Sequence, residues 1–204
     1  MGESSHKDLY FVHIPKNAGT SIEEVGLSHG LKWGKEFFDN KLCKCEHKGK
    51  SLKLAYWHLC YSDRAYDKDP DKCFCVVRDP YSRIISEFNY LNRRNLLPKK
   101  MGLNEFILYA ISSYSFNEYL LDNHQRPQSD YIFHNGSQVI GNIIKFENLE
   151  EEFKELTGLV LSKKSNVSKG SFTVDDISDK NIHLINFFYH EDFENFGYNR
   201  ISRI

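Results

Sequence analysis

Residues 9–21 read LYFVHIPKNAGTS, and this stretch decides the fold class. The apolar run at 9–14 is rich in β-forming residues and stops at Pro15, which predicts a short strand followed by a turn. Thr20 or Ser21 can then cap a helix that continues to about residue 27. The stretch therefore predicts a strand, a tight loop and a helix in direct succession.

The loop between this strand and helix has the composition of an anion-binding turn. Gly19 lets the backbone approach a ligand, and N–H groups at a helix N-terminus point toward an anion. Lys16 adds a positive charge, and Thr20 and Ser21 add hydroxyl donors. A Walker A loop has its Lys after the second Gly, whereas Lys16 precedes Gly19 here, which weakens a nucleoside-triphosphate interpretation. An ordinary capped helix start is the alternative.

A second strand-to-helix junction lies at residues 73–86, CFCVVRDPYSRIIS. The run 73–77 is continuously apolar, as expected for a buried parallel strand. Arg78 follows it, at the sheet edge where α/β proteins bind ligands. Ser86 comes about two helical turns later, so a guanidinium and a hydroxyl can converge on one phosphate. The alternative is a structural salt bridge between Arg78 and Asp79.

The rest of the chain continues the alternation of apolar strands and helices, which predicts an α/β protein with a parallel sheet covered on both sides. A length of 204 residues suits a single domain, 1–204, with residues 1–8 as a polar tail. Loops are predicted at 28–50 and 158–172. Further strands are predicted at 52–57 and 139–146, and further helices at 80–94, 103–112, 116–123, 149–156 and 177–196.

Together, HIPKNAGTS at 13–21 and VVRDPYSRIISEFNY at 76–90 resemble the two cofactor motifs of sulfotransferases that use 3′-phosphoadenosine 5′-phosphosulfate (PAPS). The variant is similar to the carbohydrate branch of that family, which includes heparan sulfate 2-O-sulfotransferase. The resemblance spans residues 9–198 and implies a P-loop-type three-layer fold with a central parallel sheet flanked by helices. It also implies transfer of a sulfuryl group from PAPS to a hydroxyl of a carbohydrate. The bisphosphate PAP would be the product, and no metal would be needed.

The resemblance assigns roles to residues of this chain. Lys16 would stabilise charge on the leaving oxygen, the loop backbone would hold the 5′-phosphate, and Arg78 and Ser86 would hold the 3′-phosphate. Lys169 and Gly170 resemble a late loop that closes over the cofactor, although a plain surface loop is the alternative. The cofactor-binding residues implied in this way are Lys16, Asn17, Ala18, Gly19, Thr20, Ser21, Arg78, Ser86, Lys169 and Gly170.

His58 follows the predicted strand at 52–57, so we expect it at the same sheet edge as Lys16 and Arg78. A histidine with a pKa near ~6.5 can accept a hydroxyl proton. In the resembling 2-O-sulfotransferases a histidine at the corresponding strand end is the base, which implies that His58 and Lys16 are the catalytic residues. A buried, hydrogen-bonded core histidine is the alternative, and Glu23 would then be the next candidate base.

Charge and cysteine content limit the partners. The net charge of −1 carries no global nucleic-acid signature, although residues 1–100 have a basic excess of five. The lysines at 41, 44, 48, 50 and 53 predict either a solvated face or a groove for an anionic glycan acceptor. The five cysteines (Cys43, Cys45, Cys60, Cys73 and Cys75) are expected to be reduced, and neither C-x-C pair has the spacing of a structural zinc site.

No run approaches the ~18 apolar residues that span a membrane, and no export signal is recognised. The sequence as given therefore predicts a cytoplasmic protein, or one of the Golgi lumen if an N-terminal anchor precedes it. Two other functions stay open. One is a nucleotide kinase or NTPase, and the other is a non-catalytic PAP- or glycan-binding module of the same fold. The oligomeric state is not predicted.

Overall fold

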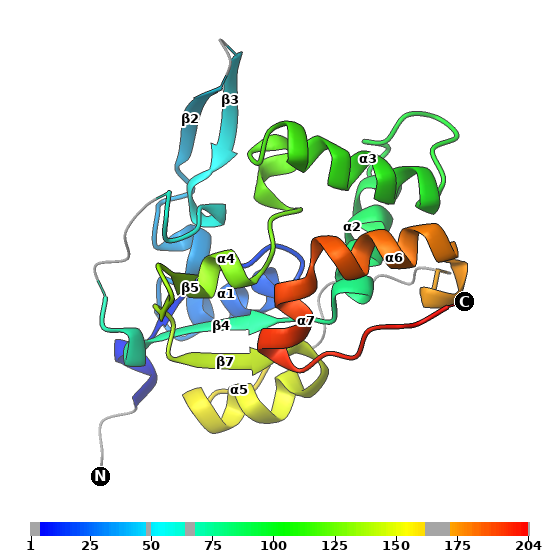
Figure 1. Ribbon diagram of the computed structural model, residues 1–204. Coiled ribbons are helices and arrows are strands. Elements are labelled where there is room, and N and C mark those ends of the chain that lie inside the picture. Colours follow the sequence, from blue (N-terminus) through cyan, green and yellow to red (C-terminus); the bar gives the residue numbers. More distant parts are fainter. Residues whose placement is uncertain (1–4, 48–49, 64–67, 162–171, 204) are drawn as a thin grey trace.

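The computed structural model describes residues 5–47, 50–63, 68–161 and 172–203 (Figure 1). Three parallel strands form its main sheet, in the order β1-β4-β7. They are β1 (Tyr10–Phe11), β4 (Cys73–Val77) and β7 (Asn142–Lys145). Each lies inside an apolar run that predicted a strand, and the N–H of Val12 donates to Phe74 O at 2.8 Å, just after β1.

Helices cover both faces of this sheet, because every residue of β4 is buried and successive side chains point to opposite faces. Cys73, Cys75 and Val77 pack in one cluster with residues of α4 (Ser129–Ile132) and α7 (His190–Phe196). Phe74 and Val76 pack in the opposite cluster with α1 (Gly19–Ser28) and α5 (Leu149–Thr157). The three-layer α/β arrangement is therefore confirmed.

A second core lies beyond the carboxyl end of β4 (Figure 1). It is made by α2 (Pro80–Arg93), α3 (Leu103–Phe116) and α6 (Asp179–Phe188), with Phe88, Phe106 and Ile182 among its buried residues. The predicted helix at 177–196 is in fact two helices, because the backbone of Tyr189 leaves the helical conformation (ψ 28°) between α6 and α7.

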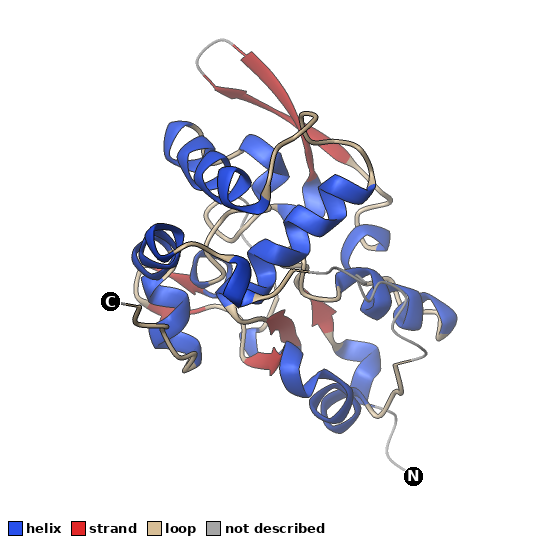
Figure 2. Ribbon diagram, turned by 90° about the vertical axis from the view of Figure 1, so that its right-hand side faces the viewer, coloured by secondary structure: helices blue, strands red, loops and turns tan. Residues whose placement is uncertain are grey.

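An antiparallel hairpin extends away from the rest of the molecule (Figures 1 and 2). Its strands are β2 (Leu42–His47) and β3 (Lys50–Ala55). The loop predicted for residues 28–50 is therefore wrong over β2, and the predicted strand at 52–57 does not join the parallel sheet. Cys43 is paired with Leu54 and Lys44 with Lys53, so apolar and polar positions alternate along the ribbon. The many lysines of the segment obscured this two-residue period in the sequence.

The predicted helix at 116–123 is also wrong. Helix α3 continues to Phe116, and Leu121, Asp122 and Asn123 then have left-handed backbone in η5 (Leu120–Asn123). None of the helices among the described residues is long and apolar enough to cross a bilayer. The remaining short elements are η1 (Ser5–Asp8), η2 (Gly34–Glu36), η3 (Tyr56–His58), η4 (Pro70–Lys72), β5 (Phe133–His134), β6 (Ser137–Gln138), η6 (Phe146–Asn148) and η7 (Val174–Asp176).

Candidate active site

The loop between β1 and α1 brings a helix N-terminus to the carboxyl edge of the sheet. Lys16 (φ 72°) and Ala18 (φ 63°) have left-handed backbone, which folds the loop into a tight turn. A Cβ at Gly19 would collide with the imidazole of His13, so a residue without a side chain is needed where α1 begins. Thr20 is exposed and Ser21 partly exposed at this end of α1. The predicted strand, loop and helix are present, but α1 begins at Gly19 with Ala18 as its N-cap and no side-chain cap, so the predicted cap by Thr20 or Ser21 is wrong.

Asn17 anchors this loop to the neighbouring strand. Its side chain is 1% exposed, and its Nδ2 donates to Val76 O and to Gln128 Oε1, both at 2.7 Å. Gln128 Oε1 also accepts the backbone N–H of Arg78 at 2.9 Å. The loop is therefore tied to the end of β4 through Nδ2 of Asn17, while the buried Oδ1 of Asn17 has no hydrogen-bond partner among the described residues.

Lys16 points toward a buried acid. Its Nζ lies 3.6 Å from Glu87 Oε2 and 3.8 Å from the centre of the Tyr90 ring. Burial lowers the pKa of Lys16, and the Glu87 carboxylate opposes that shift. Glu87 is only 2% exposed, and its pKa is lowered by His124 and Lys16 in spite of burial. A charged lysine is thus held at the mouth of the loop.

Arg78 and Ser86 line one cavity of about 470 Å³ beside α2, together with Asn89. The guanidinium of Arg78 lies over the Phe146 ring at 4.0 Å, and its NH1 donates to Lys16 O at 3.3 Å. Its Nε is buried and has no hydrogen-bond partner among the described residues. A guanidinium that lines a polar cavity can bind a phosphate group, and the Asp79 carboxylate lines the same cavity.

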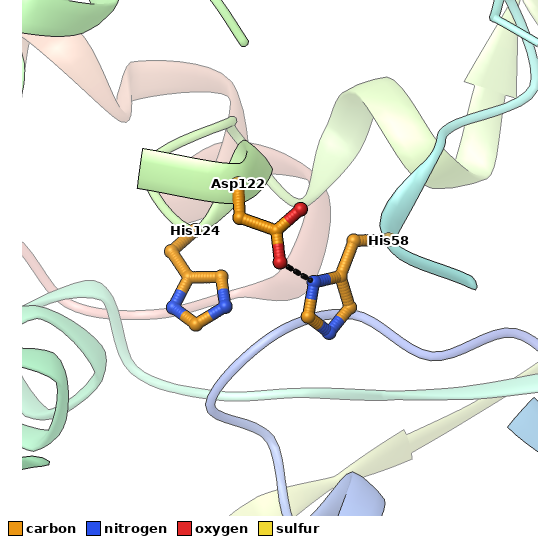
Figure 3. A group of neighbouring side chains, drawn as sticks. All are labelled: His58, Asp122 and His124. Carbon is orange, nitrogen blue, oxygen red and sulfur yellow. Dashed lines mark hydrogen bonds and ion pairs between the residues drawn. The ribbon is translucent and has the colours of Figure 1, made fainter. Parts of the chain in front are cut away.

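His58 lies at the end of η3, directly after the hairpin. Its Nδ1 is 2.9 Å from Asp122 Oδ2, and Figure 3 shows this pair beside His124. The centre of the His58 ring is 5.0 Å from the ring centres of both His13 and His124. Burial lowers the pKa of His58 to about 4, and the Asp122 carboxylate acts against that shift. The imidazole is therefore neutral at physiological pH, and the sequence-based expectation of a pKa near ~6.5 is revised downward.

Two residues that the sequence did not single out connect Lys16 with His58. Glu87 contacts Lys16 through Oε2, while its Oε1 lies 2.9 Å from Nδ1 of His124. The His124 ring in turn packs against His58. The structure thus brings His58 to the sheet edge expected for it, although it arrives from the hairpin rather than from a strand of the parallel sheet.

The sequence contained partial signals for the residues that were missed. His13 stands inside the quoted loop, and Glu87 follows Ser86 on the buried side of α2. Asp122 falls in the segment at 116–123 that was misread as a helix, and His124 directly follows it. Asp and Asn tolerate left-handed backbone better than most residues, so the pair at 122 and 123 could have indicated a turn.

Among the described residues, the others that the sequence analysis named are not part of this network. Lys169 and Gly170 lie outside the described residues. Glu23, the alternative base, is occupied, because its Oε1 accepts from His13 Nδ1 at 2.7 Å and from the Lys35 N–H at 2.9 Å. Cys73 and Cys75 are buried in β4 on one face, as expected, and Cys43, Cys60, Cys73 and Cys75 are free thiols.

Potential metal-ligating atoms of His58, Asp122 and His124 lie within 4.8 Å of one another (Figure 3). Both oxygens of Asp122 already accept hydrogen bonds, one from His58 and one from the Ala55 N–H at 2.7 Å. Nδ1 of His124 faces Glu87. The cluster is therefore explained as a hydrogen-bonded network, and we assign no metal to it.

A parallel sheet, a helix N-terminus and a polar cavity at one edge are typical of α/β proteins that bind anionic ligands. A sequence model of the sulfotransferase family matches residues 4–199, nearly the whole chain. The chain belongs to the sulfotransferase family, whose fold is P-loop-like, and the predictions of this family and fold are confirmed. Searches of the curated proteins and of the solved structures find no match to this chain.

Proposed function

We propose that this sulfotransferase moves the sulfuryl group of PAPS to a hydroxyl of a carbohydrate, with His58 as base and Lys16 as the residue that stabilises the leaving oxygen. The observation that carries the proposal is the buried network Lys16–Glu87–His124–His58, beside the cavity lined by Arg78. It joins a cation and a neutral histidine at the edge of the sheet where α1 begins.

The donor would occupy two phosphate sites. The N-terminus of α1, with the backbone of residues 17–21, suits the 5′-phosphosulfate. The guanidinium of Arg78 and the hydroxyl of Ser86 line one cavity and suit a 3′-phosphate, which would select PAPS over ATP. Lys169 and Gly170 remain proposed contacts on the strength of the sequence alone.

In the proposed reaction the acceptor oxygen attacks sulfur in line with the departing phosphate oxygen. A new S–O bond forms, the bond from sulfur to the 5′-phosphate oxygen breaks, and its electron pair stays on PAP. Nε2 of His58 takes the acceptor proton, which a buried and neutral imidazole can do at pH 7. The positive charge of Lys16 stabilises the charge that develops on the leaving oxygen, so the step needs no metal.

The hairpin supports an anionic acceptor. Lys44 and Lys53 are paired directly across β2 and β3, and both are exposed. Like charges in that position destabilise a sheet, and a bound anion would relieve the repulsion. The hairpin leads into η3, where the partly exposed Trp57 ring lies 5.5 Å from the His58 ring. A flat apolar face beside the base suits a sugar ring.

The decisive experiment incubates the protein with labelled PAPS and a panel of glycans, small alcohols and phenols, and identifies the sulfated product by mass. His58→Ala should lower kcat by ~10²–10⁴ and leave PAP affinity unchanged. Lys16→Ala should lower both quantities, because Lys16 would touch the donor as well as the developing charge. Near-normal turnover by His58→Ala would remove His58 from the mechanism.

Thermal melting, together with the turnover assay, separates the proposed function from the two alternatives, a nucleotide kinase or NTPase and a non-catalytic binding module. PAP should raise the melting temperature more than ATP with magnesium, since a ligand that binds only the native state stabilises it by RT ln(1 + [L]/Kd). A greater effect of ATP would favour a kinase or NTPase. Strong PAP binding with no turnover on any acceptor would favour a non-catalytic binding module.

A further inference from the structure

Three consecutive residues beside His58 have left-handed backbone. They are Leu121 (φ 56°, ψ 32°), Asp122 (φ 54°, ψ 44°) and Asn123 (φ 61°), and none is glycine. A side chain makes this conformation unfavourable, most of all at Leu121. Such backbone persists only where surrounding contacts impose it, and it gathers at functional sites.

The contacts that this turn makes converge on His58. Asp122 Oδ2 accepts from His58 Nδ1 at 2.9 Å, and Asn123 Nδ2 donates to the His58 carbonyl at 2.9 Å. Asn123 is fully buried, and the Tyr131 hydroxyl donates to the same carbonyl at 3.0 Å. The turn therefore fixes both the main chain and the imidazole of His58.

We infer that Asp122 is a positioning residue for the proposed base: its carboxylate holds the His58 imidazole in the tautomer that carries hydrogen on Nδ1 and leaves the lone pair of Nε2 free. This inference rests on the proposed role of His58. The carboxylate can only accept a hydrogen bond, so Nδ1 must be the donor. The groups that face His58 are Asp122, His13, His124 and Trp57, and Asp122 is the one acid among them.

The two oxygens of Asp122 separate this role from a purely structural one. Oδ1 accepts from the Ala55 N–H at 2.7 Å and so secures the base of the hairpin, whereas Oδ2 serves the imidazole. An asparagine can keep the first contact and tolerates left-handed backbone. Its amide group would then face Nδ1 as a donor, which requires the opposite tautomer, with hydrogen on Nε2.

The first test reads the tautomer without any reaction. ¹⁵N spectra of the imidazoles at neutral pH, with His58→Gln to assign the signal among the nine histidines, should show Nδ1–H in the wild type and Nε2–H in Asp122→Asn. Asp39→Asn is the matched control, because Asp39 is exposed and also has left-handed backbone (φ 47°), and it should retain Nδ1–H. The same tautomer in wild type and Asp122→Asn would overturn the inference.

The second test is kinetic. Asp122→Asn should lower kcat by ~10²–10⁴ while KM for PAPS and affinity for PAP stay unchanged. The double variant His58→Ala/Asp122→Asn should be no slower than His58→Ala, because Asp122 acts through His58. Additive losses, or wild-type kcat in Asp122→Asn, would contradict the inference.

Asp122→Gly covers the case in which the asparagine variant folds poorly. Glycine favours left-handed backbone, so this variant removes the carboxylate without adding strain, and it should show the same loss of kcat. Wild-type kcat in Asp122→Gly would contradict the inference. If the wild-type protein transfers no sulfuryl group to any acceptor, the proposed function fails, and the tautomer measurement still decides the role of Asp122.

Discussion

At the scale of single residues, Glu87 organises the charge of the site. One oxygen lies near Lys16 and the other near His124, and the carboxylate is almost completely buried. A buried acid is stable only when paired, because desolvation of an isolated charge is expensive. The lowered pKa of Glu87 shows that its cationic neighbours outweigh burial, so the acid remains charged and holds Lys16 in place.

Gly19 gives the first prediction. Gly19→Ala should destabilise the protein by about 1–3 kcal/mol and weaken PAP binding, because the new methyl group overlaps the buried imidazole of His13. His13 has little room to move, since Glu23 holds its Nδ1. Denaturant unfolding and PAP titration check both effects. Ala18→Gly is the adjacent control and should keep or raise stability, because Ala18 has a φ of 63°.

Arg78 gives the second prediction. Arg78→Ala should weaken PAP binding by about 2–4 kcal/mol, as expected for loss of a charge-assisted phosphate contact. Adenosine 5′-phosphosulfate lacks the 3′-phosphate and should bind almost as before. Calorimetric titration of both ligands checks the difference. Equal losses for the two ligands would show that Arg78 acts only through its contacts with Lys16 and Phe146.

At the scale of elements, the hairpin predicts that the same substitutions leave stability unchanged or higher but weaken binding of the acceptor. Replacing Lys44 and Lys53 by Gln removes a cross-strand repulsion, so stability should stay the same or rise by ~0.2–1 kcal/mol. KM for an anionic glycan acceptor should nevertheless rise by about tenfold, because two phosphate- or sulfate-attracting charges are lost. KM values measured at several salt concentrations check this.

A matched control for the hairpin is Lys154→Gln/Lys180→Gln, which removes two exposed lysines from α5 and α6. It should leave KM for the anionic acceptor unchanged. An equal rise of KM in both double variants would indicate a general effect of net charge, and no rise in either would remove the hairpin from acceptor binding.

The elements also show which features the sequence could reveal. The strands of the main sheet and helices α1, α2 and α5 follow from apolar period and from Pro and Gly positions, because local preference and burial agree there. The loop between β1 and α1 and the place of Arg78 at the end of β4 followed for the same reason. The first strand of the hairpin was missed because lysines dominate its segment and obscure the alternation of apolar and polar positions. The turn at 121–123 was missed because distant contacts with His58 and Ala55 impose it.

At the scale of the whole molecule, the site lies where two hydrophobic cores meet. Arg83 of α2 is buried, and its guanidinium donates to the Pro15, His124 and Arg126 carbonyls at 3.2, 3.0 and 2.9 Å. These contacts join the loop between β1 and α1 to the segment that carries His124. The geometry of Lys16 and His58 therefore depends on how the two cores dock, which no local sequence pattern encodes.

The last prediction concerns stability against pH. The pKa of His58 is about 4 in the folded protein, because of burial, and near ~6.5 in the unfolded chain. Between these values the unfolded state binds the proton and the folded state does not, so this residue makes stability fall as pH falls from about 6.5 to 4. Asp130 acts in the opposite sense over the same window, because burial raises its pKa to about 6.

The contribution of His58 is therefore measured as a difference between two proteins. Urea unfolding from pH 7 to 4 should show that the wild type loses about 3 kcal/mol relative to His58→Gln, which cannot take up the proton. His183→Gln replaces an exposed histidine and should run parallel to the wild type. If the His58→Gln and wild-type curves run parallel down to pH 4, the pKa of His58 is the same in the folded and unfolded states, and burial does not lower it.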